Sequence, residues 1–318
     1  MANSDLLKQQ IISLANKELK HVKNDMSLNI NDKFLELPII VNDRDIVEGV
    51  LCYRYGHNGH LISPSPQIGC CVGCKFCDMS DLSYGCNLSA EIMLEQIALV
   101  LNRALRYGYQ VTEKPLKISF VKGGETLLNP EFPKLLDLIA KNLTVPIKIS
   151  TTFPDVPMAH QVYQAVEKFA IKYPETFQIQ ISLISTNQQF RQQLTKMPLI
   201  SFEQLRQYAE SWQKNVPQPR KITLTFTLTE NTPCDPQEII NILSPQYFAI
   251  RIRDYMPTTP GLKAGLSDSS ESRVQDVTRQ FEQAGYQMIP GRIGVTERRF
   301  KLSAGHIIKI YKSFLNRN

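Results

Sequence analysis

Four of the seven cysteines fall within eight residues, in the run Gly69-Cys70-Cys71-Val72-Gly73-Cys74-Lys75-Phe76-Cys77. Cys70, Cys74 and Cys77 are separated by three and then two residues. Thiolates spaced in this way on one loop can each bind a different iron of a [4Fe–4S] cluster. The run therefore predicts an iron–sulfur cluster with three protein ligands, which leaves the fourth iron open to another molecule.

Two other uses of the cysteines compete with this prediction. A structural zinc site closes with a fourth Cys or His, which Cys52, Cys86, His57 or His60 could supply, but a second pair of closely spaced cysteines is missing. A disulfide framework is disfavoured in a long chain without a secretory signal. Taking Cys71 as the first cluster ligand gives a spacing of two and two residues, which is the weaker alternative.

Composition places the protein in a broad class. The chain has 318 residues, of which 42% are hydrophobic, so it can bury a sizeable core. The chain has an odd number of cysteines, seven, and four of them are gathered in one loop, which indicates a reducing compartment and a metal. No apolar stretch approaches the roughly 18 residues of a membrane helix, and no signal peptide is visible. We therefore expect a cytoplasmic protein that does not enter the membrane.

The charge permits an anionic partner without requiring a nucleic acid, because the net charge is only +6. The C-terminal segment, residues 291–318, is more strongly basic, because it contains seven Lys or Arg residues and a single acidic residue, Glu297. A solvated basic face explains them better than a phosphate-binding patch does. The cations are Arg292, Arg298, Arg299, Lys301, Lys309, Lys312 and Arg317.

The N-terminal part reads as one helix followed by short strands. Apolar residues recur at helical spacing over residues 5–24, and residues 35–55 alternate between apolar and polar around an Asn42-Asp43 turn. Residues 55–60 are expected to form a loop. After the cysteine run, Ser89 is a suitable N-cap for a helix that continues to about Tyr107.

From there the chain alternates between strands and helices. Such repeated βα units predict a parallel sheet with right-handed crossovers, and their number favours a partial (β/α)6 TIM-like barrel with a short N-terminal extension. The expected regions are 1–60, the barrel at 61–290 and a basic closing segment at 291–318. The predicted strands are 116–121, 147–151, 177–184, 221–227 and 247–252; the predicted helices are 131–142, 156–172, 187–213, 236–243, 269–284 and 303–315. Residues 217–219 and 257–261 read as loops.

Several predicted strands end in residues that suit ligand binding, and parallel barrels keep their chemistry at these ends. The first strand after the cysteine run leads into Gly123-Gly124-Glu125, where glycines allow close approach of a ligand and the carboxylate can bind an ammonium group. The next two strands end near Ser150 and Ser182, whose hydroxyls can bond a carboxylate or a ribose.

These motifs resemble those of a known superfamily. The cysteine run, with Phe76 before its last cysteine, is similar to the signature of the radical S-adenosylmethionine (SAM) enzymes, in which SAM binds the open iron. A closer resemblance is to the RlmN/Cfr family, radical SAM methyltransferases that act on an adenine of ribosomal or transfer RNA. It is carried by Ser63-Pro64-Ser65-Pro66-Gln67-Ile68-Gly69-Cys70, Cys74-Lys75-Phe76-Cys77, Asn87-Leu88-Ser89-Ala90-Glu91-Ile92, Gly124-Glu125-Thr126-Leu127-Leu128-Asn129, Ser150-Thr151 and Ser182-Leu183.

The resemblance covers roughly residues 60 to 310 and implies a fold, cofactors and contacts. The fold would be the partial barrel of the radical SAM type, and the cofactors a [4Fe–4S] cluster and SAM. An electron would come from a reductase such as flavodoxin or ferredoxin. The SAM contacts would fall on Gly124, Glu125, Ser150, Ser182, Leu183 and Ile184.

The chain also departs from that family. Methyl transfer there uses a second cysteine near the C-terminus, and Ala304 stands at the matching position, where no nucleophile is available. The family's Pro-Trp-Asn-Pro segment is replaced near Tyr255, and only about 60 residues precede the barrel. We therefore expect a radical SAM enzyme that cleaves SAM reductively and abstracts hydrogen from a small anionic substrate, in preference to RNA.

The expected substrate contacts include arginines near a strand end, which suit a carboxylate or phosphate. The full set of expected substrate contacts is Arg251, Arg253, Tyr255, Arg292 and His306. One alternative is an RNA adenine methyltransferase that uses another thiol, namely Cys52, Cys86 or Cys234. The other alternative is a non-enzymatic binding protein in which the cluster is structural.

Overall fold

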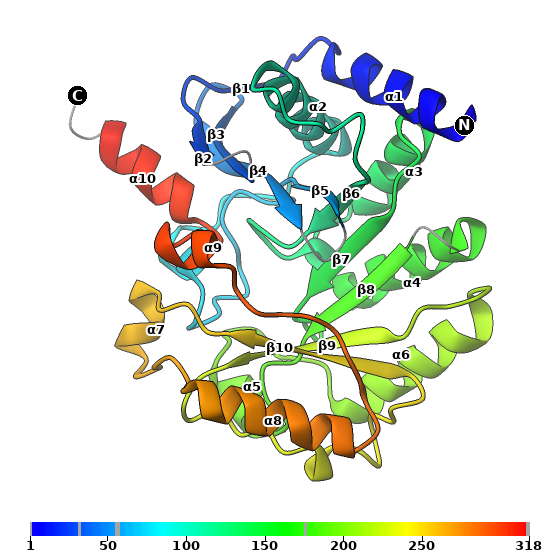
Figure 1. The fold of residues 1–318 in the computed structure, drawn as a ribbon, viewed down its shortest axis with the longest axis vertical. Coiled ribbons are helices and arrows are strands. Elements are labelled where there is room, and N and C mark those ends of the chain that lie inside the picture. Colours follow the sequence, from blue (N-terminus) through cyan, green and yellow to red (C-terminus); the bar gives the residue numbers. More distant parts are fainter. Residues whose placement is uncertain (1, 31–32, 55–57, 175–176, 316–318) are drawn as a thin grey trace. The chain divides into compact units, whose positions relative to one another are not determined.

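The computed structural model describes residues 2–30, 33–54, 58–174 and 177–315. The chain divides into two compact units, whose elements are labelled in Figure 1. The first unit comprises Met1–Cys70, Ser83–Ile149 and Ala304–Asn318, and the second comprises Cys71–Leu82 and Ser150–Ser303. The functional regions expected from the sequence, with boundaries near residues 60 and 290, stay a prediction.

The first unit begins with a helix and an antiparallel part of its sheet. Helix α1 (Ala2–Ala15) is followed by β1 (Val22–Lys23), β2 (Leu28–Ile30), β3 (Phe34–Val41), β4 (Asp45–Arg54) and β5 (Gly59–Ser63). β3 pairs with β1, β2 and β4, and β4 pairs with β5, all antiparallel. The predicted turn between β3 and β4 is confirmed, because Asn42 and Asp43 adopt φ angles of 49° and 61°.

Two N-terminal predictions need correction. The helix expected over residues 5–24 ends at Ala15. Beyond it the buried carboxylate of Glu95 accepts hydrogen bonds from the backbone amides of Lys20 and His21, and Val22 pairs with β3. The loop expected over 55–60 is shorter, because Gly59 and His60 already belong to β5; residues 55–57 lie outside the described part of the chain.

The rest of the first unit is an α/β arrangement. β6 (Leu116–Phe120) lies parallel to β5 and to β7 (Ile147–Thr151), whose last two residues belong to the second unit. Helix α2 (Ala90–Arg106) begins as predicted, since Ser89 Oγ accepts a hydrogen bond from the Ile92 amide. It packs against β3 and β4. Helix α3 (Phe132–Asn142) packs against α2, and helix α10 (His306–Leu315) packs against β3 and β4. The short 3₁₀ helix η3 (Thr126–Leu128) follows β6.

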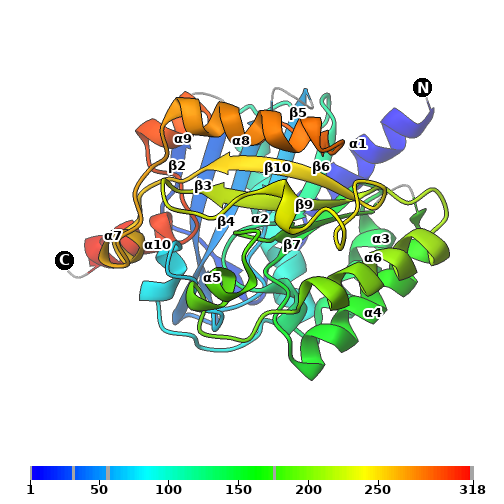
Figure 2. The same cartoon turned by 90° about the horizontal axis from the view of Figure 1, so that it is seen from below.

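The second unit contains parallel strands and their connecting helices. β8 (Phe177–Ser182), β9 (Ile222–Leu228), β10 (Phe248–Asp254) and β11 (Gln287–Met288) pair in this order, all parallel. Helices α4 (Pro157–Lys172) and α6 (Phe202–Asn215) lie side by side in Figure 1 and Figure 2. The remaining elements are η2 (Asp78–Asp81), α5 (Gln188–Gln193), η5 (Pro236–Glu238), α7 (Thr259–Lys263), α8 (Glu271–Gln283) and α9 (Val295–Arg299).

Three predictions of helix and loop in this unit were wrong in detail. The helix expected over 187–213 is split into α5 and α6, because Pro198 interrupts it and Ser201 forms a capping box with Gln204 at the start of α6. The helix expected over 236–243 is the single turn η5 followed by turns. The loop expected over 257–261 contains the start of α7, whose N-cap Thr258 bonds the Gly261 amide.

Candidate functional site

The cysteine run is anchored separately in each unit. Cys70 ends a segment of the first unit, whereas Cys74 and Cys77 belong to the second, and all three are half-buried. In the first unit Gly69 has φ 71°, and a Cβ there would lie 2.3 Å from the Ser83 carbonyl oxygen. Only glycine fits so close to another backbone. The turn that leads into Cys70 is therefore fixed by the close approach of the Ser83 backbone to Gly69.

In the second unit the run is bound to segments that follow two strands. The Lys75 amide donates to the Leu194 carbonyl at 2.9 Å, and the Thr258 hydroxyl donates to the Phe76 carbonyl at 3.2 Å. The Phe76 ring packs on an apolar cluster of Ile184, Leu194, Leu199, Tyr255 and Leu266. Within this unit Cys74 and Cys77 are thus held beside residues that follow the C-terminal ends of β8 and β10.

The predicted cluster ligands stay a prediction. Over residues 2–30, 33–54, 58–174 and 177–315, no group of three or more His, Cys, Asp or Glu side chains is arranged to hold a metal ion. The donor chemistry nevertheless suits a cluster, because half-buried thiolates on one glycine-containing loop are the ligands that iron–sulfur clusters take. These residues therefore fit such a group by donor type.

The Gly-Gly-Glu segment forms a tight loop after β6 in the first unit. Gly123 and Gly124 adopt φ angles of 42° and 126°, and a Cβ on Gly123 would lie 1.9 Å from Ser65 Oγ. The amide of Glu125 donates to Gln67 Oε1 at 2.8 Å, and Glu125 Oε1 accepts from the Leu127 amide at 3.1 Å. The loop is therefore packed against the segment that leads into Cys70, and its carboxylate is buried.

The strand ends of the second unit bring two predicted residues together. Gln180 on β8 donates from Nε2 to Ser150 Oγ at 3.0 Å, and its Oε1 accepts from Arg251 Nη1 at 3.0 Å. Gln180 thus links a predicted SAM contact to a predicted substrate contact. Gln180 was not predicted as a site residue, although its position two residues before Ser182 on the same strand places it on the same face.

Ile184 adopts an unusual backbone conformation at the end of β8. Its φ is 75°, a region that β-branched residues rarely enter, and the amides of Leu183 and Ile184 both donate to the Thr225 carbonyl. Strain of this kind persists only where the surroundings enforce it, and it concentrates at functional sites. The roles of Leu183 and Ile184 as SAM contacts stay predictions.

Arg191 explains part of this conformation and was not predicted as a site residue. Its guanidinium is completely buried, donates from Nε to the Leu183 carbonyl at 2.9 Å and from Nη1 to the Ile200 carbonyl at 3.0 Å. Its Nη2 has no hydrogen-bond partner among the described residues, and burial lowers the pKa of Arg191 to about 9. Burial of a cation carries a free-energy penalty of desolvation unless the cation is well bonded. Arg191 therefore supports the turn after β8 at a cost in folding free energy.

The other expected substrate residues have different contacts, and each has its own partners or position in the fold. Arg253 approaches Glu297 at 3.6 Å, and Arg292 pairs with Asp254 at 2.7 Å and with Glu271 at 2.6 Å. The buried hydroxyl of Tyr255 accepts from the Thr258 amide. His306 lies in the first unit, at the start of α10. Their roles toward a substrate stay predictions, and the ion pairs of Arg292 also account for that residue structurally.

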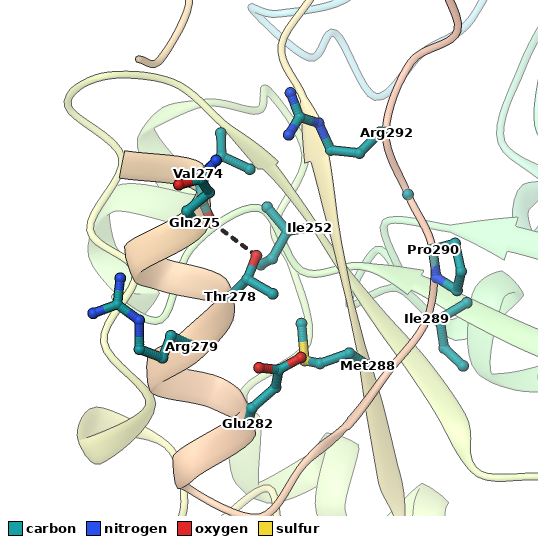
Figure 3. Close-up of a pocket in the computed structure, with 11 residues that line it drawn as sticks. Ile252, Val274, Gln275, Thr278, Arg279, Glu282, Met288, Ile289, Pro290 and Arg292 are labelled. Carbon is teal, nitrogen blue, oxygen red and sulfur yellow. Dashed lines mark hydrogen bonds between the residues drawn. The ribbon is translucent and has the colours of Figure 1, made fainter. Parts of the chain in front are cut away.

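A cavity of about 560 Å³ lies in the second unit, between α8 and residues 288–292. Figure 3 shows Thr278 on α8 and Met288 opposite it, with Arg292 at one end. Arg292 is the single predicted substrate residue among those that line it. The cavity therefore does not coincide with the predicted SAM contacts.

The three alternative thiols have different surroundings. Cys86 is exposed, and its carbonyl accepts from the Ile68 amide at 3.0 Å, so it lies beside the segment that leads into Cys70. Cys52 is buried on β4. Burial raises the pKa of Cys234 far above its ordinary value, which disfavours the nucleophilic thiolate there.

Comparison with known proteins supports the resemblance. No family model matches the chain. The chain is 26% identical over 237 residues to a probable dual-specificity RNA methyltransferase RlmN of Alkaliphilus metalliredigens (strain QYMF), covering 70% of this chain and 62% of that protein. It is 28% identical over 217 residues to a probable RNA methyltransferase of Ectopseudomonas mendocina (strain ymp), covering 67% and 56% respectively. The chain thus spans about three fifths of the length of these curated relatives.

A solved structure supports the fold. The crystal structure of a radical SAM methyltransferase from Sphaerobacter thermophilus superimposes with a TM-score of 0.70 and 17% identity, over 88% of this chain and 80% of that one. The chain is similar to the RlmN-like radical SAM methyltransferases. The predicted resemblance and the predicted α/β fold of the radical SAM type are therefore confirmed. In the described part of this RlmN-like chain, no helix is long and apolar enough to cross a membrane.

Proposed function

We propose that this RlmN-like chain is a radical SAM enzyme that modifies RNA. Cys70, Cys74 and Cys77 would hold a [4Fe–4S] cluster, and Gly124, Glu125, Ser150, Ser182, Leu183 and Ile184 would contact SAM. When bound, the cluster supplies the electron that cleaves SAM to methionine and a 5′-deoxyadenosyl radical. The observation that carries the proposal is the Gly-Gly-Glu loop, which Gln67 holds against the segment leading into Cys70.

The residues of the chain would bind and orient SAM. The buried carboxylate of Glu125 can accept charge-assisted hydrogen bonds from the methionyl ammonium group, although one of its oxygens also caps η3. The hydroxyl of Ser150 can donate to an acceptor on SAM while it accepts from Gln180. The strained backbone at Ile184 would be supported from behind by Arg191.

RNA is the proposed substrate class because both curated relatives described above are named RNA methyltransferases. The small anionic substrate expected from the sequence has no support from these relatives. The net charge of +6 is compatible with either substrate. A reductase such as flavodoxin or ferredoxin would supply the electron, and a cytoplasmic location remains part of the proposal.

Methyl transfer through another thiol is a second candidate function. Ala304 provides no nucleophile, but the exposed Cys86 lies beside the segment that leads into Cys70. In this version Cys86 would receive a methyl group from SAM and carry it to the RNA. Mass spectrometry of the protein after incubation with methyl-labelled SAM distinguishes the two candidates, since only the second leaves a methyl group on Cys86.

The proposed function is tested by anaerobic reconstitution with iron and sulfide, reduction with dithionite and addition of SAM. We expect SAM to yield 5′-deoxyadenosine. Addition of unmodified RNA should increase the amount of 5′-deoxyadenosine and produce a modified nucleoside in that RNA. A metabolite extract that stimulates the reaction while RNA does not would favour the small-molecule substrate. Intact SAM under all conditions would contradict radical SAM activity and favour a non-enzymatic binding protein.

A further inference from the structure

A buried carboxylate in the first unit holds two distant glycine amides. Glu48 on β4 is completely buried, and its Oε1 accepts from the Gly123 amide at 3.0 Å. The Gly305 amide donates to the same carboxylate, at 3.0 Å from Oε1 and 2.9 Å from Oε2. Gly123 belongs to the Gly-Gly-Glu loop, and Gly305 lies between Ala304 and His306 at the start of α10.

The backbone of Glu48 is itself fixed. The Ser65 hydroxyl donates to the Glu48 carbonyl at 2.8 Å and accepts from the Glu48 amide at 3.3 Å. Ser65 also lies against Gly123, where a Cβ would clash with its hydroxyl. Glu48 is therefore positioned by the segment that leads into the cysteine run, and it cannot shift without moving that segment.

The electrostatic surroundings make this carboxylate unusual. Lys122 Nζ pairs with the buried Glu36 at 2.9 Å and also acts electrostatically on Glu48, so this cation is shared between two acidic groups. The pKa of Glu48 is raised from 4.5 to about 7, chiefly by burial and also by the nearby Glu36, while Lys122 and the two glycine amides act in the opposite direction. Cys52 on β4 also interacts with Lys122, and His306 and Lys309 are the titratable groups of α10 nearest to Gly305 in sequence.

We propose that Glu48 is a positioning residue whose single carboxylate fixes the Gly-Gly-Glu loop and the start of α10 relative to each other. Ala304 and His306, which flank Gly305, are thereby held at a constant position with respect to the loop. An apolar side chain could fill the same space but could not bond both amides, and a buried carboxylate is retained at a cost in desolvation. The meaning of the loop as a SAM contact rests on the proposed function, whereas the coupling of the two segments does not.

Hydrogen exchange on the full chain tests the coupling. Glu48→Gln keeps the size of the side chain but removes its charge and one acceptor oxygen. At pH 8, where Glu48 is mostly ionised, we expect amide exchange to become about tenfold faster or more in both residues 120–125 and residues 302–308, because bonds to a charged acceptor are lost in both. Faster exchange in only one of the two segments would contradict the proposal.

Glu95→Gln is the matched control. Glu95 is also a buried carboxylate of the first unit that accepts two backbone amides, those of Lys20 and His21. Its substitution should accelerate exchange near residues 20–21 and leave 120–125 and 302–308 unchanged. If Glu95→Gln loosened the latter segments equally, the effect of Glu48→Gln would reflect general destabilisation, and the proposal would fail.

A measurement on the unaltered protein covers the case in which Glu48→Gln does not fold. With ¹⁵N-glycine labelling, the amide resonances of Gly123 and Gly305 can be followed between pH 5 and pH 9. Both should move with one common midpoint, since both amides donate to the same carboxylate. Independent midpoints, or no movement, would overturn the proposal. Loss of SAM cleavage with intact coupling would instead count against the proposed function.

Discussion

At the scale of single residues, Glu125 is the side chain whose predicted role is most directly testable. Its carboxylate is buried, caps η3 and follows two glycines that pack closely against Ser65 and Gln67. Glu125→Gln preserves the shape and the acceptor for the Leu127 amide but removes the charge. Because hydrogen bonds to charged groups contribute about 1.5–3 kcal/mol, we expect the Kd for SAM to rise about ten- to a hundredfold, measured by calorimetry with reconstituted protein.

The control for Glu125 is Glu131→Gln. Glu131 lies close in sequence, at the start of α3, and its carboxylate is within 3.8 Å of Lys134 at the surface. This substitution should leave SAM binding unchanged. Equal affinity of the Glu125→Gln variant and the parent would mean that the Gly-Gly-Glu assignment is wrong.

Glu48 gives a prediction about pH and stability. Its pKa is raised from 4.5 to about 7 in the folded protein, so its contribution to stability is fully present below pH 4.5 and is lost as the pH rises through about 7. The shift corresponds to roughly 3 kcal/mol. The free energy of unfolding of the parent should therefore fall relative to that of Glu48→Gln between pH 5 and pH 8, as measured by urea denaturation. A constant difference across this range would contradict the raised pKa.

At the scale of elements, the sequence predicted those with a clear local signal. Helix α2 and the β3–β4 turn follow from Ser89 and from Asn42-Asp43, whose preferences agree with the fold. The end of α1 did not follow, because the competing partner Glu95 is more than seventy residues away in sequence. The break between α5 and α6 was visible in Pro198 and the Ser201 capping box, but the surrounding helical periodicity outweighed it.

The residues of the candidate site also divide into those that a local sequence signal predicts and those that it does not. Cys70, Cys74, Cys77 and Glu125 could be proposed from spacing and resemblance, because their chemistry is written in short motifs. Gln180 and Glu48 could not, since each bonds groups that are distant in sequence. Arg191 could not either, although the carbonyls that it bonds are only eight and nine residues away. A lone Gln, Arg or Glu in a strand or helix carries no local sign that it will be buried.

The cysteine run yields a prediction for one element as a whole. Anaerobically reconstituted protein should contain about four irons per chain and show broad visible absorption, as three-thiolate [4Fe–4S] sites do. Alanine at Cys70, Cys74 or Cys77 should remove most of the iron, because each thiolate binds a different iron atom. Cys71→Ala is the matched control and should keep the iron. Loss of iron in Cys71→Ala together with its retention in Cys70→Ala would identify the alternative register.

At the scale of the whole molecule, the relation to RNA methyltransferases meets a chemical obstacle. The chain spans about three fifths of its curated relatives, and Ala304 stands where the resemblance places the methyl-carrying cysteine. The segment around Ala304 is nevertheless held in place in this chain, since the Gly305 amide donates to the buried carboxylate of Glu48. A chain that keeps the support of this segment without its thiol is expected to keep the binding of SAM and lose the two-step transfer.

This expectation separates the two products that SAM can give. Loading a thiol with a methyl group releases S-adenosylhomocysteine, whereas reductive cleavage releases 5′-deoxyadenosine. Because alanine has no nucleophile, the parent should form 5′-deoxyadenosine and no S-adenosylhomocysteine above background, as measured by liquid chromatography with mass spectrometry. Ala304→Cys provides the positive control, since it restores a thiol at the supported position and should restore methyl loading. Stoichiometric S-adenosylhomocysteine from the parent, or a methyl group on Cys52, Cys86 or Cys234, would show that another thiol has taken over the carrier role.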